Sequence, residues 1–342
     1  MSMNQGALAT LVWTRASEAR KTPSRSLAER HVLPSSILHR EKKMKKGPKF
    51  PPSLLKRFSA QCRGTGTYEQ YIPWHRVNRS DPSSHGRSHL QIWHGRQREL
   101  LSDLELVAFL FSTMHPSVVD IREQFPLNLQ LAQHELNGYQ AGSVREWAPG
   151  TIELAERLQM KHPISSEAGI SSSWIMTTDL LLTLKEPDGH FKLLAISVKP
   201  SVGWMTRRKL ELLNLERQYW ICRNVPWLLI TPQLYEDRVA DLLKSVSHWA
   251  LGENHNDALL QWVGNQAQDF DRKNLTQILR RITQECGCPQ TAQYAFWQAV
   301  WTGRLPFDLH RSWRASAPFL LVSPAAFWAR NPIVSGRTAW DH

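Results

Sequence analysis

The sequence has no run of 18 or more apolar residues, and it is poor in cysteine. The first absence argues against a membrane-spanning helix, and the apolar stretch 7–13 lacks both the length and the preceding basic flank of a secretory signal. The cysteines are Cys62, Cys222, Cys286 and Cys288. Four are too few for a disulfide-stabilised fold, and the last two have no second pair to complete a zinc tetrad. We therefore expect a soluble protein of a reducing cytoplasm that does not act at a membrane.

Acidic residues are scarce in one part of the chain. The 42 Lys and Arg exceed the 30 Asp and Glu by a net charge of +12. Residues 1–57 carry +10 of this charge and residues 58–342 only +2. The basic arm contains the lysines Lys42, Lys43, Lys45, Lys46 and Lys49. Such an arm releases counterions from a polyphosphate and indicates DNA binding, although a solubilising tail or a segment that docks on an acidic protein has the same composition.

The chain is long enough for more than one domain, and its composition and hydrophobic pattern change along its length. Residues 1–57 mix Ser, Pro and Lys without a sustained period, so we expect a mostly disordered basic arm, with a short helix near 54–58. Residues 58–235 have the pattern of a mixed α/β domain, and residues 236–330 are rich in helical patterns. We expect residues 331–342 to form a tail.

The α/β region begins with a buried helix. The spacing of Ser102 and Glu105 is that of a capping box, and an apolar run follows to Phe111. Strands are expected at 118–125, 175–184, 191–198 and 226–231, and further helices at 152–159 and 206–222. This order of elements predicts a mixed sheet covered by helices.

The C-terminal region has helical patterns at 239–249, 274–286 and 291–301. Two short apolar segments, 305–309 and 319–322, follow and are compatible with a small hairpin. Helices that end in a β-ribbon are typical of a winged helix-turn-helix domain.

A turn in the middle of the α/β region fixes the pairing of two strands. The Asp188-Gly189 dipeptide predicts a hairpin whose three-residue loop, 187–189, pairs Glu186 with His190. This register sets Asp179 opposite Ser197 and leaves Lys199 diagonal to it on the same face. A slip of one residue would separate the carboxylate from the ammonium group.

A carboxylate and a lysine on adjacent strands can support metal-dependent phosphodiester hydrolysis. Mg²⁺ prefers oxygen ligands and retains several waters, so one or two carboxylates and a backbone carbonyl suffice to hold it. The lysine can then orient or deprotonate the attacking water. A structural salt bridge between Asp179 and Lys199 is the alternative.

Several sequence blocks resemble the TnsA family of transposon-end endonucleases, in the family's order and over about residues 65–231. The most specific blocks are Leu100–Leu106 and Asp120–Leu127. The others are Tyr71–Trp74, Gly86–His89, Lys161–Pro163, Thr178–Asp179, Val198–Pro200 and Leu215–Trp220.

The resemblance implies a fold, an activity and a set of partners. The fold would be a restriction-endonuclease-like core of the PD-(D/E)XK type, followed by a winged-helix domain. The activity would be Mg²⁺-dependent cleavage of the 5′ strands at transposon ends, with Mn²⁺ as a substitute metal. The partners would be transposon-end DNA, a TnsB-like DDE transposase and a TnsC-like AAA+ ATPase, in a bacterial cytoplasm.

The resemblance also implies roles for individual residues. Glu105 and Asp179 match the metal-binding carboxylates, and Lys199 matches the catalytic lysine. Ser197 departs from the family, which often has Gln there, while related nucleases have Glu or Asp. The backbone carbonyl of Val198 would complete the metal ligands, and Ser197 and Glu216 would support them.

Each of these side chains also has a simpler interpretation. Glu105 has the position of a capping-box glutamate. Lys199 precedes Pro200 and suits an edge strand that resists aggregation. Glu216 could form an ion pair with Arg217 or with a residue one turn away on an exposed helix.

Three functions remain compatible with the sequence. The first is the transposase-associated endonuclease, and the second is a restriction-like or resolvase-like nuclease that works alone. The third is a winged-helix adaptor with a degenerate nuclease site, for which Ser197 is the motivating residue.

Overall fold

The computed structural model describes residues 50–77, 87–142, 146–203, 205–252, 256–310 and 316–340. The chain divides into two compact units, 1–45 and 46–342, and all the described residues belong to the second. The predicted DNA-binding lysines, Lys42 to Lys49, therefore lie outside the described residues.

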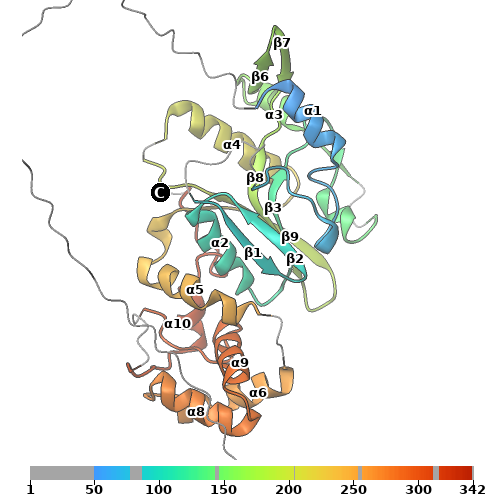
Figure 1. Ribbon diagram of the computed structural model, residues 1–342. Coiled ribbons are helices and arrows are strands. Elements are labelled where there is room, and N and C mark those ends of the chain that lie inside the picture. Colours follow the sequence, from blue (N-terminus) through green and yellow to red (C-terminus); the bar gives the residue numbers. More distant parts are fainter. Residues whose placement is uncertain are drawn as a thin grey trace, which may run out of the picture. The chain divides into compact units, whose positions relative to one another are not determined.

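A mixed four-stranded sheet forms the centre of this unit, with strand order β10-β9-β8-β3 (Figure 1). The strands are β3 (Val118–Pro126), β8 (Thr177–Lys185), β9 (Phe191–Val198) and β10 (Trp227–Ile230). Strands β3, β8 and β9 pair antiparallel, whereas β9 and β10 run parallel. The predicted mixed α/β fold is confirmed. Leu180, Leu181 and Leu182 are all fully buried, because this part of the sheet is covered on both faces.

The hairpin register agrees with the prediction. Leu180 pairs with Ile196 and Lys185 with Phe191, which sets Asp179 level with Ser197. The amide of Glu186 donates to the carbonyl of His190 at 2.8 Å. Gly189 has φ +86°, a conformation that glycine adopts without a steric cost.

Two helices pack on this sheet as expected from their sequence patterns. Helix α2 (Asp103–Thr113) begins after Ser102, whose hydroxyl accepts from the amide of Glu105, and it is buried from Glu105 to Ser112. Helix α4 (Arg207–Ile221) begins after Thr206 and connects β9 to the parallel strand β10. These two helices carry two of the acidic side chains of the candidate site.

A hairpin that the sequence did not predict packs beside β3 through buried charges. It consists of β1 (His89–Trp93) and β2 (Arg96–Leu100). The guanidinium of Arg96 donates to both carboxylate oxygens of Glu123 at 2.6 and 2.7 Å, and Arg98 contacts Asp120 at 3.3 Å. None of these four side chains is more than 7% exposed, so each charge depends on its partner.

The first helix crosses the predicted end of the basic arm. Helix α1 (Pro52–Ala60) contains the predicted boundary between Arg57 and Phe58. Leu55 and Phe58 are buried, and Phe58 meets Trp74 edge-on, with ring centres 5.4 Å apart. The apolar spacing of i and i+3 therefore extends the folded unit upstream of residue 58.

The region between β3 and β8 contains short elements. Helix α3 (Thr151–Arg157) is close to the predicted 152–159. The paired strands β4 (Ala132–Gln133) with β5 (Trp147–Ala148), and β6 (Ile164–Glu167) with β7 (Ile170–Ser173), were not predicted. Strands of two to four residues carry too few positions for a recognisable alternation.

The C-terminal part is helical. Its helices are α5 (Asp237–Ala250), α6 (Asp257–Asn265), α7 (Ala267–Phe270), α8 (Leu275–Cys286), α9 (Pro289–Trp301) and α10 (Pro324–Ala329). The three predicted helices correspond to α5, α8 and α9. The expected hairpin is represented among the described residues by an isolated bridge between Phe307 and Leu321. The winged-helix assignment stays a prediction.

Residues near the C-terminus pack on the outer strand of the sheet. The amide of Ala339 donates to the carbonyl of Leu229 at 2.8 Å, and the amide of Leu229 donates to Thr338 Oγ1 at 3.1 Å. Trp340 meets Trp227 nearly edge-on, with ring centres 5.6 Å apart. Residues 338–340, predicted as part of a tail, thus satisfy backbone groups of β10.

We expect Trp340→Ala to lower the free energy of unfolding by about 2 kcal/mol, because it removes a partly buried aromatic contact. Urea denaturation followed by circular dichroism measures this change. Trp328→Ala, on α10, serves as a comparison for the loss of a tryptophan away from β10. An unchanged unfolding midpoint in Trp340→Ala would contradict a stabilising role for these residues.

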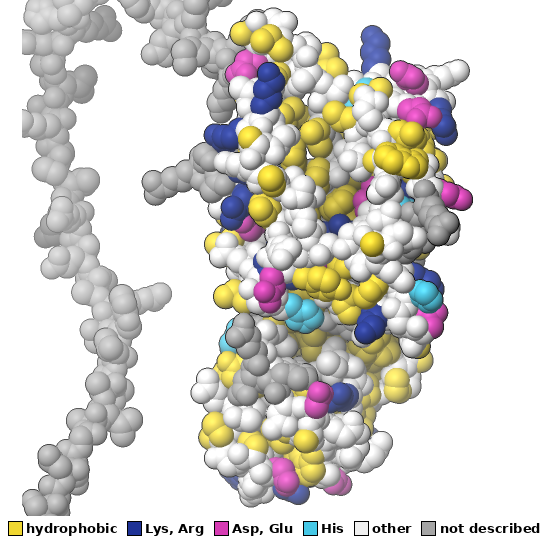
Figure 2. Space-filling view, turned by 90° about the vertical axis from the view of Figure 1, so that its right-hand side faces the viewer, with side chains coloured by type: hydrophobic (Ala, Val, Ile, Leu, Met, Phe, Trp, Pro, Cys, Tyr) yellow, Lys and Arg dark blue, Asp and Glu magenta, His cyan; other side chains and the backbone are white. Residues whose placement is uncertain are grey.

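The surface of the described unit is mixed in charge. Lys and Arg side chains alternate with Asp and Glu on the face that Figure 2 presents. This agrees with the small net charge of residues 58–342. None of the helices in the described part of the chain is long and apolar enough to cross a membrane.

Candidate active site

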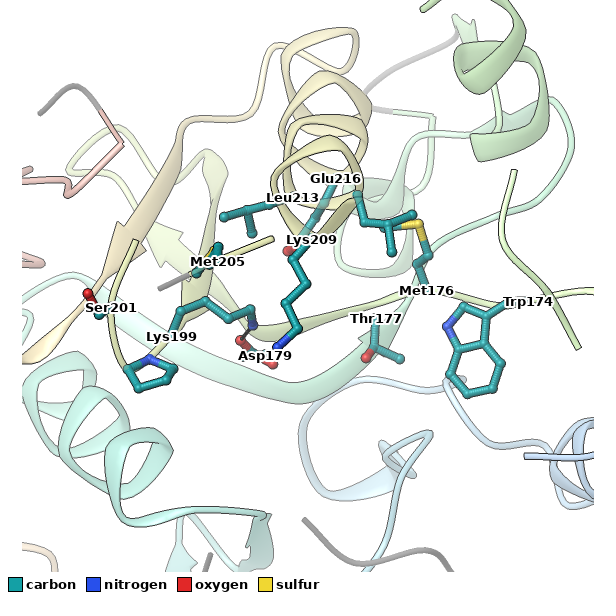
Figure 3. Close-up of a pocket in the computed structure, with 12 residues that line it drawn as sticks. Trp174, Met176, Thr177, Asp179, Lys199, Ser201, Met205, Lys209, Leu213 and Glu216 are labelled. Carbon is teal, nitrogen blue, oxygen red and sulfur yellow. Dashed lines mark hydrogen bonds and ion pairs between the residues drawn. The ribbon is translucent and has the colours of Figure 1, made fainter. Parts of the chain in front are cut away.

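Asp179 and Lys199 meet at the ends of β8 and β9 (Figure 3). Asp179 Oδ2 accepts from Lys199 Nζ at 2.6 Å and from the amide of Val198 at 2.6 Å. The backbone amide of Lys199 donates to the carbonyl of Ile230 on β10 at 3.0 Å. This hydrogen bond fixes the backbone from which the Lys199 side chain extends. The Lys199 side chain keeps one third of its surface exposed. The pair is thus rigidly held yet accessible.

Glu105 approaches this pair from the first turn of α2. Its carboxylate accepts from the amide of Leu101 at 2.8 Å, from Ser102 Oγ at 3.2 Å and from Gln124 Nε2 at 2.9 Å. Burial, and next the charge of Asp179, raise its pKa to about 7. Glu105 therefore supports the helix start and also lies within electrostatic reach of the site.

Glu216 reaches the same site from α4. It is 4% exposed and accepts hydrogen bonds from Thr178 Oγ1 at 2.8 Å and from Ser197 Oγ at 2.5 Å. Burial raises its pKa to about 6, although the neighbouring Lys199 opposes this shift. The alternative interpretation of Glu216, an ion pair on an exposed helix, is therefore wrong.

Lys199 is surrounded by acidic groups. Burial by itself would lower the pKa of its ammonium group, but the charges of Asp179, Glu216 and Glu105 outweigh burial and raise it. The side chain is therefore a cation at neutral pH. A charge-stabilising role suits it better than the role of a base that deprotonates water.

The raised pKa values predict a pH dependence of stability. The folded protein binds protons at Glu105 and Glu216 more tightly than the unfolded chain, whose glutamates titrate near 4.5. Their contribution to stability is complete below pH 4.5 and is lost as the pH rises to about 7. For Glu105 we expect a loss of about 3 kcal/mol, since one pKa unit corresponds to about 1.4 kcal/mol.

Urea unfolding in EDTA between pH 4.5 and 7.5 measures this dependence. Glu105→Gln should remove most of the Glu105 contribution and flatten the curve relative to the parent. Parallel curves for the two proteins would contradict the raised pKa of Glu105.

A cavity of about 600 Å³ opens beside the Asp179–Lys199 pair. Asp179, Lys199 and Glu216 form its polar side. Its apolar side is lined by Trp174, Met176, Met205, Leu212 and Leu213. Lys209, on the first turn of α4, extends toward the pair (Figure 3). The sequence reasoning missed Lys209, although its position in the run Arg207–Lys209 near the site was a possible signal.

The possible metal ligands at the site are carboxylates and a backbone carbonyl. Within the described ranges, no group of three or more His, Cys, Asp or Glu side chains is arranged to hold a metal ion. Glu105 and Asp179 do interact electrostatically, and both present oxygen atoms only. Two carboxylates with the Val198 carbonyl suit Mg²⁺, because this ion keeps several waters. The cation would also offset the repulsion between the two carboxylates.

His162 and two tryptophans of the C-terminal part have structural roles. His162 is hydrogen bonded to Thr151 Oγ1 at 3.0 Å, and Trp297 and Trp301 are buried in the core. By contrast, Gln124 was not singled out, although it lies in the block Asp120–Leu127 that resembles the family.

Comparison with known proteins gives two matches. Residues 115–232 match the family described as TnsA-like endonuclease N terminal. Over 184 residues the chain is 38% identical to the transposon Tn7 transposition protein TnsA of Escherichia coli. This alignment covers 53% of the chain and 58% of the relative, so the chain matches little more than half of that protein's length. Asp179, Lys199 and Glu216 lie within the family match, and Glu105 precedes it.

Proposed function

We propose that this chain is a TnsA-family protein and the endonuclease subunit of a heteromeric transposase, because residues 115–232 match the TnsA-like endonuclease family and the chain is 38% identical to a TnsA protein. It would cleave the 5′ strands at the ends of a transposon during cut-and-paste transposition. The observation that carries the proposal is the Asp179–Lys199 contact beside a 600 Å³ cavity, with Glu105 in electrostatic reach.

The residues at the site would have different roles in phosphodiester hydrolysis. The Lys199 ammonium group, held by Asp179, faces the cavity and would stabilise the negative charge that develops on the phosphate. Asp179, Glu105 and the Val198 carbonyl would hold Mg²⁺. The bound ion would polarise the phosphate and lower the pKa of a coordinated water. Glu216 would hold Lys199 in its charged form.

Ser197 has a place in this arrangement. A serine at this position is shorter than the Gln, Glu or Asp of related nucleases, and its hydroxyl donates to the carboxylate of Glu216. We infer that Glu216 provides from α4 the negative charge that nucleases with Glu or Asp at the position of Ser197 carry on the strand. This supports an active nuclease over a degenerate site.

The finer assignments extend the same proposal. They are a PD-(D/E)XK type of core, a winged-helix C-terminal part, and partnership with a TnsB-like transposase and a TnsC-like ATPase on transposon-end DNA. The order of strands around Asp179 and Lys199 supports the type of core, and the C-terminal helices with the Phe307–Leu321 bridge support the winged-helix part. The name of the matched relative, a transposition protein, supports the partnership.

A strand-resolved cleavage assay tests the proposal. The protein is incubated with a labelled transposon-end duplex and Mg²⁺, alone and together with the TnsB-like partner, and each strand is followed separately. Cleavage of the 5′ strand that requires the partner is expected. Cleavage without any partner would favour a nuclease that works alone. An assembled complex that leaves both strands intact would favour the adaptor.

The basic arm should strengthen DNA binding without sequence preference. Because α1 belongs to the folded unit, the deletion should end at residue 49 and spare Pro52–Ala60. The deletion removes the five lysines together with six other Lys and Arg residues. Loss of the five lysines alone should reduce the slope of log K against log salt concentration by as much as about 4. Fluorescence anisotropy at several salt concentrations measures the slope. An unchanged slope would assign the arm to solubility.

A further inference from the structure

Gln124 has an unusual backbone conformation next to the candidate site. It lies inside β3, is 3% exposed and has φ +50°. Left-handed conformations are uncommon for residues with a Cβ atom and persist only where the surroundings enforce them. Because Glu123 pairs with Leu180 and Phe125 with Thr178, the register places Gln124 level with Asp179.

Gln124 is hydrogen bonded to Glu105 and to the backbone of Trp74. Its side-chain Nε2 donates to Glu105 Oε2 at 2.9 Å, and its carbonyl accepts from the amide of Trp74 at 3.3 Å. The same Glu105 oxygen also accepts from the amide of Leu101. The carboxylate is therefore held between the start of α2 and the strand that lies beside Asp179.

We propose that Gln124 is a positioning residue that holds the Glu105 carboxylate in its working orientation beside Asp179. The inference rests on the proposed nuclease function and deepens it. Gln124 acts through Glu105 and has no role in contacting the DNA. Its amide is suited to this task, because it donates to a carboxylate without adding charge. A glutamate at residue 124 would repel Glu105, and an apolar side chain would leave it without this donor.

The strained backbone supports the same conclusion. Gln124 combines a costly φ with a specific side-chain contact to a residue of the candidate site. Strain of this kind is concentrated where a precise geometry is needed. The hydrogen bond from the Trp74 amide to the Gln124 carbonyl also helps to hold this backbone conformation.

Two substitutions separate the hydrogen bond from the backbone strain. Gln124→Met retains the size of the side chain but removes the donor. Gln124→Gly removes the donor and also relieves the strain. Both should lower the single-turnover rate of strand cleavage about 10- to 100-fold, as is typical when a group that orients a metal ligand is lost. The affinity for DNA, measured in EDTA, should remain that of the parent, and the melting temperature of each variant, measured in parallel, should show that both are folded.

A double-mutant cycle provides a further test. In Glu105→Asp the shorter side chain breaks the contact with Gln124, so adding Gln124→Met should change the cleavage rate less than twofold. Gln124→Gly cleaving as fast as the parent would overturn the inference, as would full additivity in the cycle. If the parent itself cleaves neither strand, the proposed function fails. If the parent cleaves and the Gln124 variants cleave as fast as the parent, the proposed function stands and only the role assigned to Gln124 is wrong.

Discussion

Asp179→Asn should reduce strand cleavage about 1000-fold while the protein remains folded. The substitution keeps the shape of the side chain, and its amide oxygen can still accept from the amide of Val198. It removes the charge that holds Lys199 at 2.6 Å and one of the two proposed carboxylate ligands. Cleavage is measured under single-turnover conditions with saturating protein, so that weaker DNA binding does not enter the rate.

The fold of Asp179→Asn should be close in stability to that of the parent near neutral pH. The substitution removes the ion pair with Lys199, but it also removes a charge that raises the pKa of Glu105, so a relieved repulsion offsets part of the lost attraction. Asp188→Asn is the matched control, because this aspartate lies in the exposed turn of the same hairpin. Cleavage by Asp179→Asn at the rate of the control would show that the site assignment is wrong.

The pairing of Asp179 with Lys199 could be predicted because it depends on local information. The turn at Asp188-Gly189 sets the register, and the period of two along each strand then decides which side chains share a face. The turn and the burial of the strands favour the same register. A short stretch of sequence was therefore sufficient to predict that Asp179 and Lys199 lie together.

The contribution of Glu216 could not be derived in the same way. Its approach to Ser197 depends on how α4, which connects β9 to β10, packs on the sheet, and this packing is set by contacts across the whole unit. From sequence alone, a glutamate beside an arginine on a helix has the pattern of an exposed ion pair. The structure buries the glutamate instead and turns Arg217 toward Trp340.

The hairpin of β1 and β2 was missed for a related reason. Its second strand, Arg96–Leu100, contains three charged residues, which a hydropathy pattern assigns to the surface. Arg96 and Arg98 are nevertheless buried, because Glu123 and Asp120 on β3 compensate their charges. A partner 22 to 27 residues away in sequence cannot be recognised from the pattern of the strand itself.

Glu216→Gln should lower the rate of strand cleavage about 100-fold, whereas Ser197→Ala should lower it about 10-fold or less. The glutamine retains the size of the side chain and can still accept from Thr178, but it removes a negative charge that faces Lys199. The alanine removes one donor to Glu216 and leaves the charge in place. Glu211→Gln, on the same helix but paired with Arg207 and Arg208, is the control.

Moving the carboxylate from α4 to β9 is a sharper test of whether Glu216 supplies the negative charge that Ser197 lacks. The double variant Ser197→Asp with Glu216→Gln restores a negative charge to the site from β9 instead of α4. If the charge is what matters, this variant should cleave about 10-fold faster than Glu216→Gln alone, because interacting positions show non-additive effects. Residue 197 is fully buried, so the melting temperature must be measured in parallel. A folded double variant that is no faster than Glu216→Gln would mean that Glu216 acts by its particular position on α4, and the inferred compensation for Ser197 would be wrong.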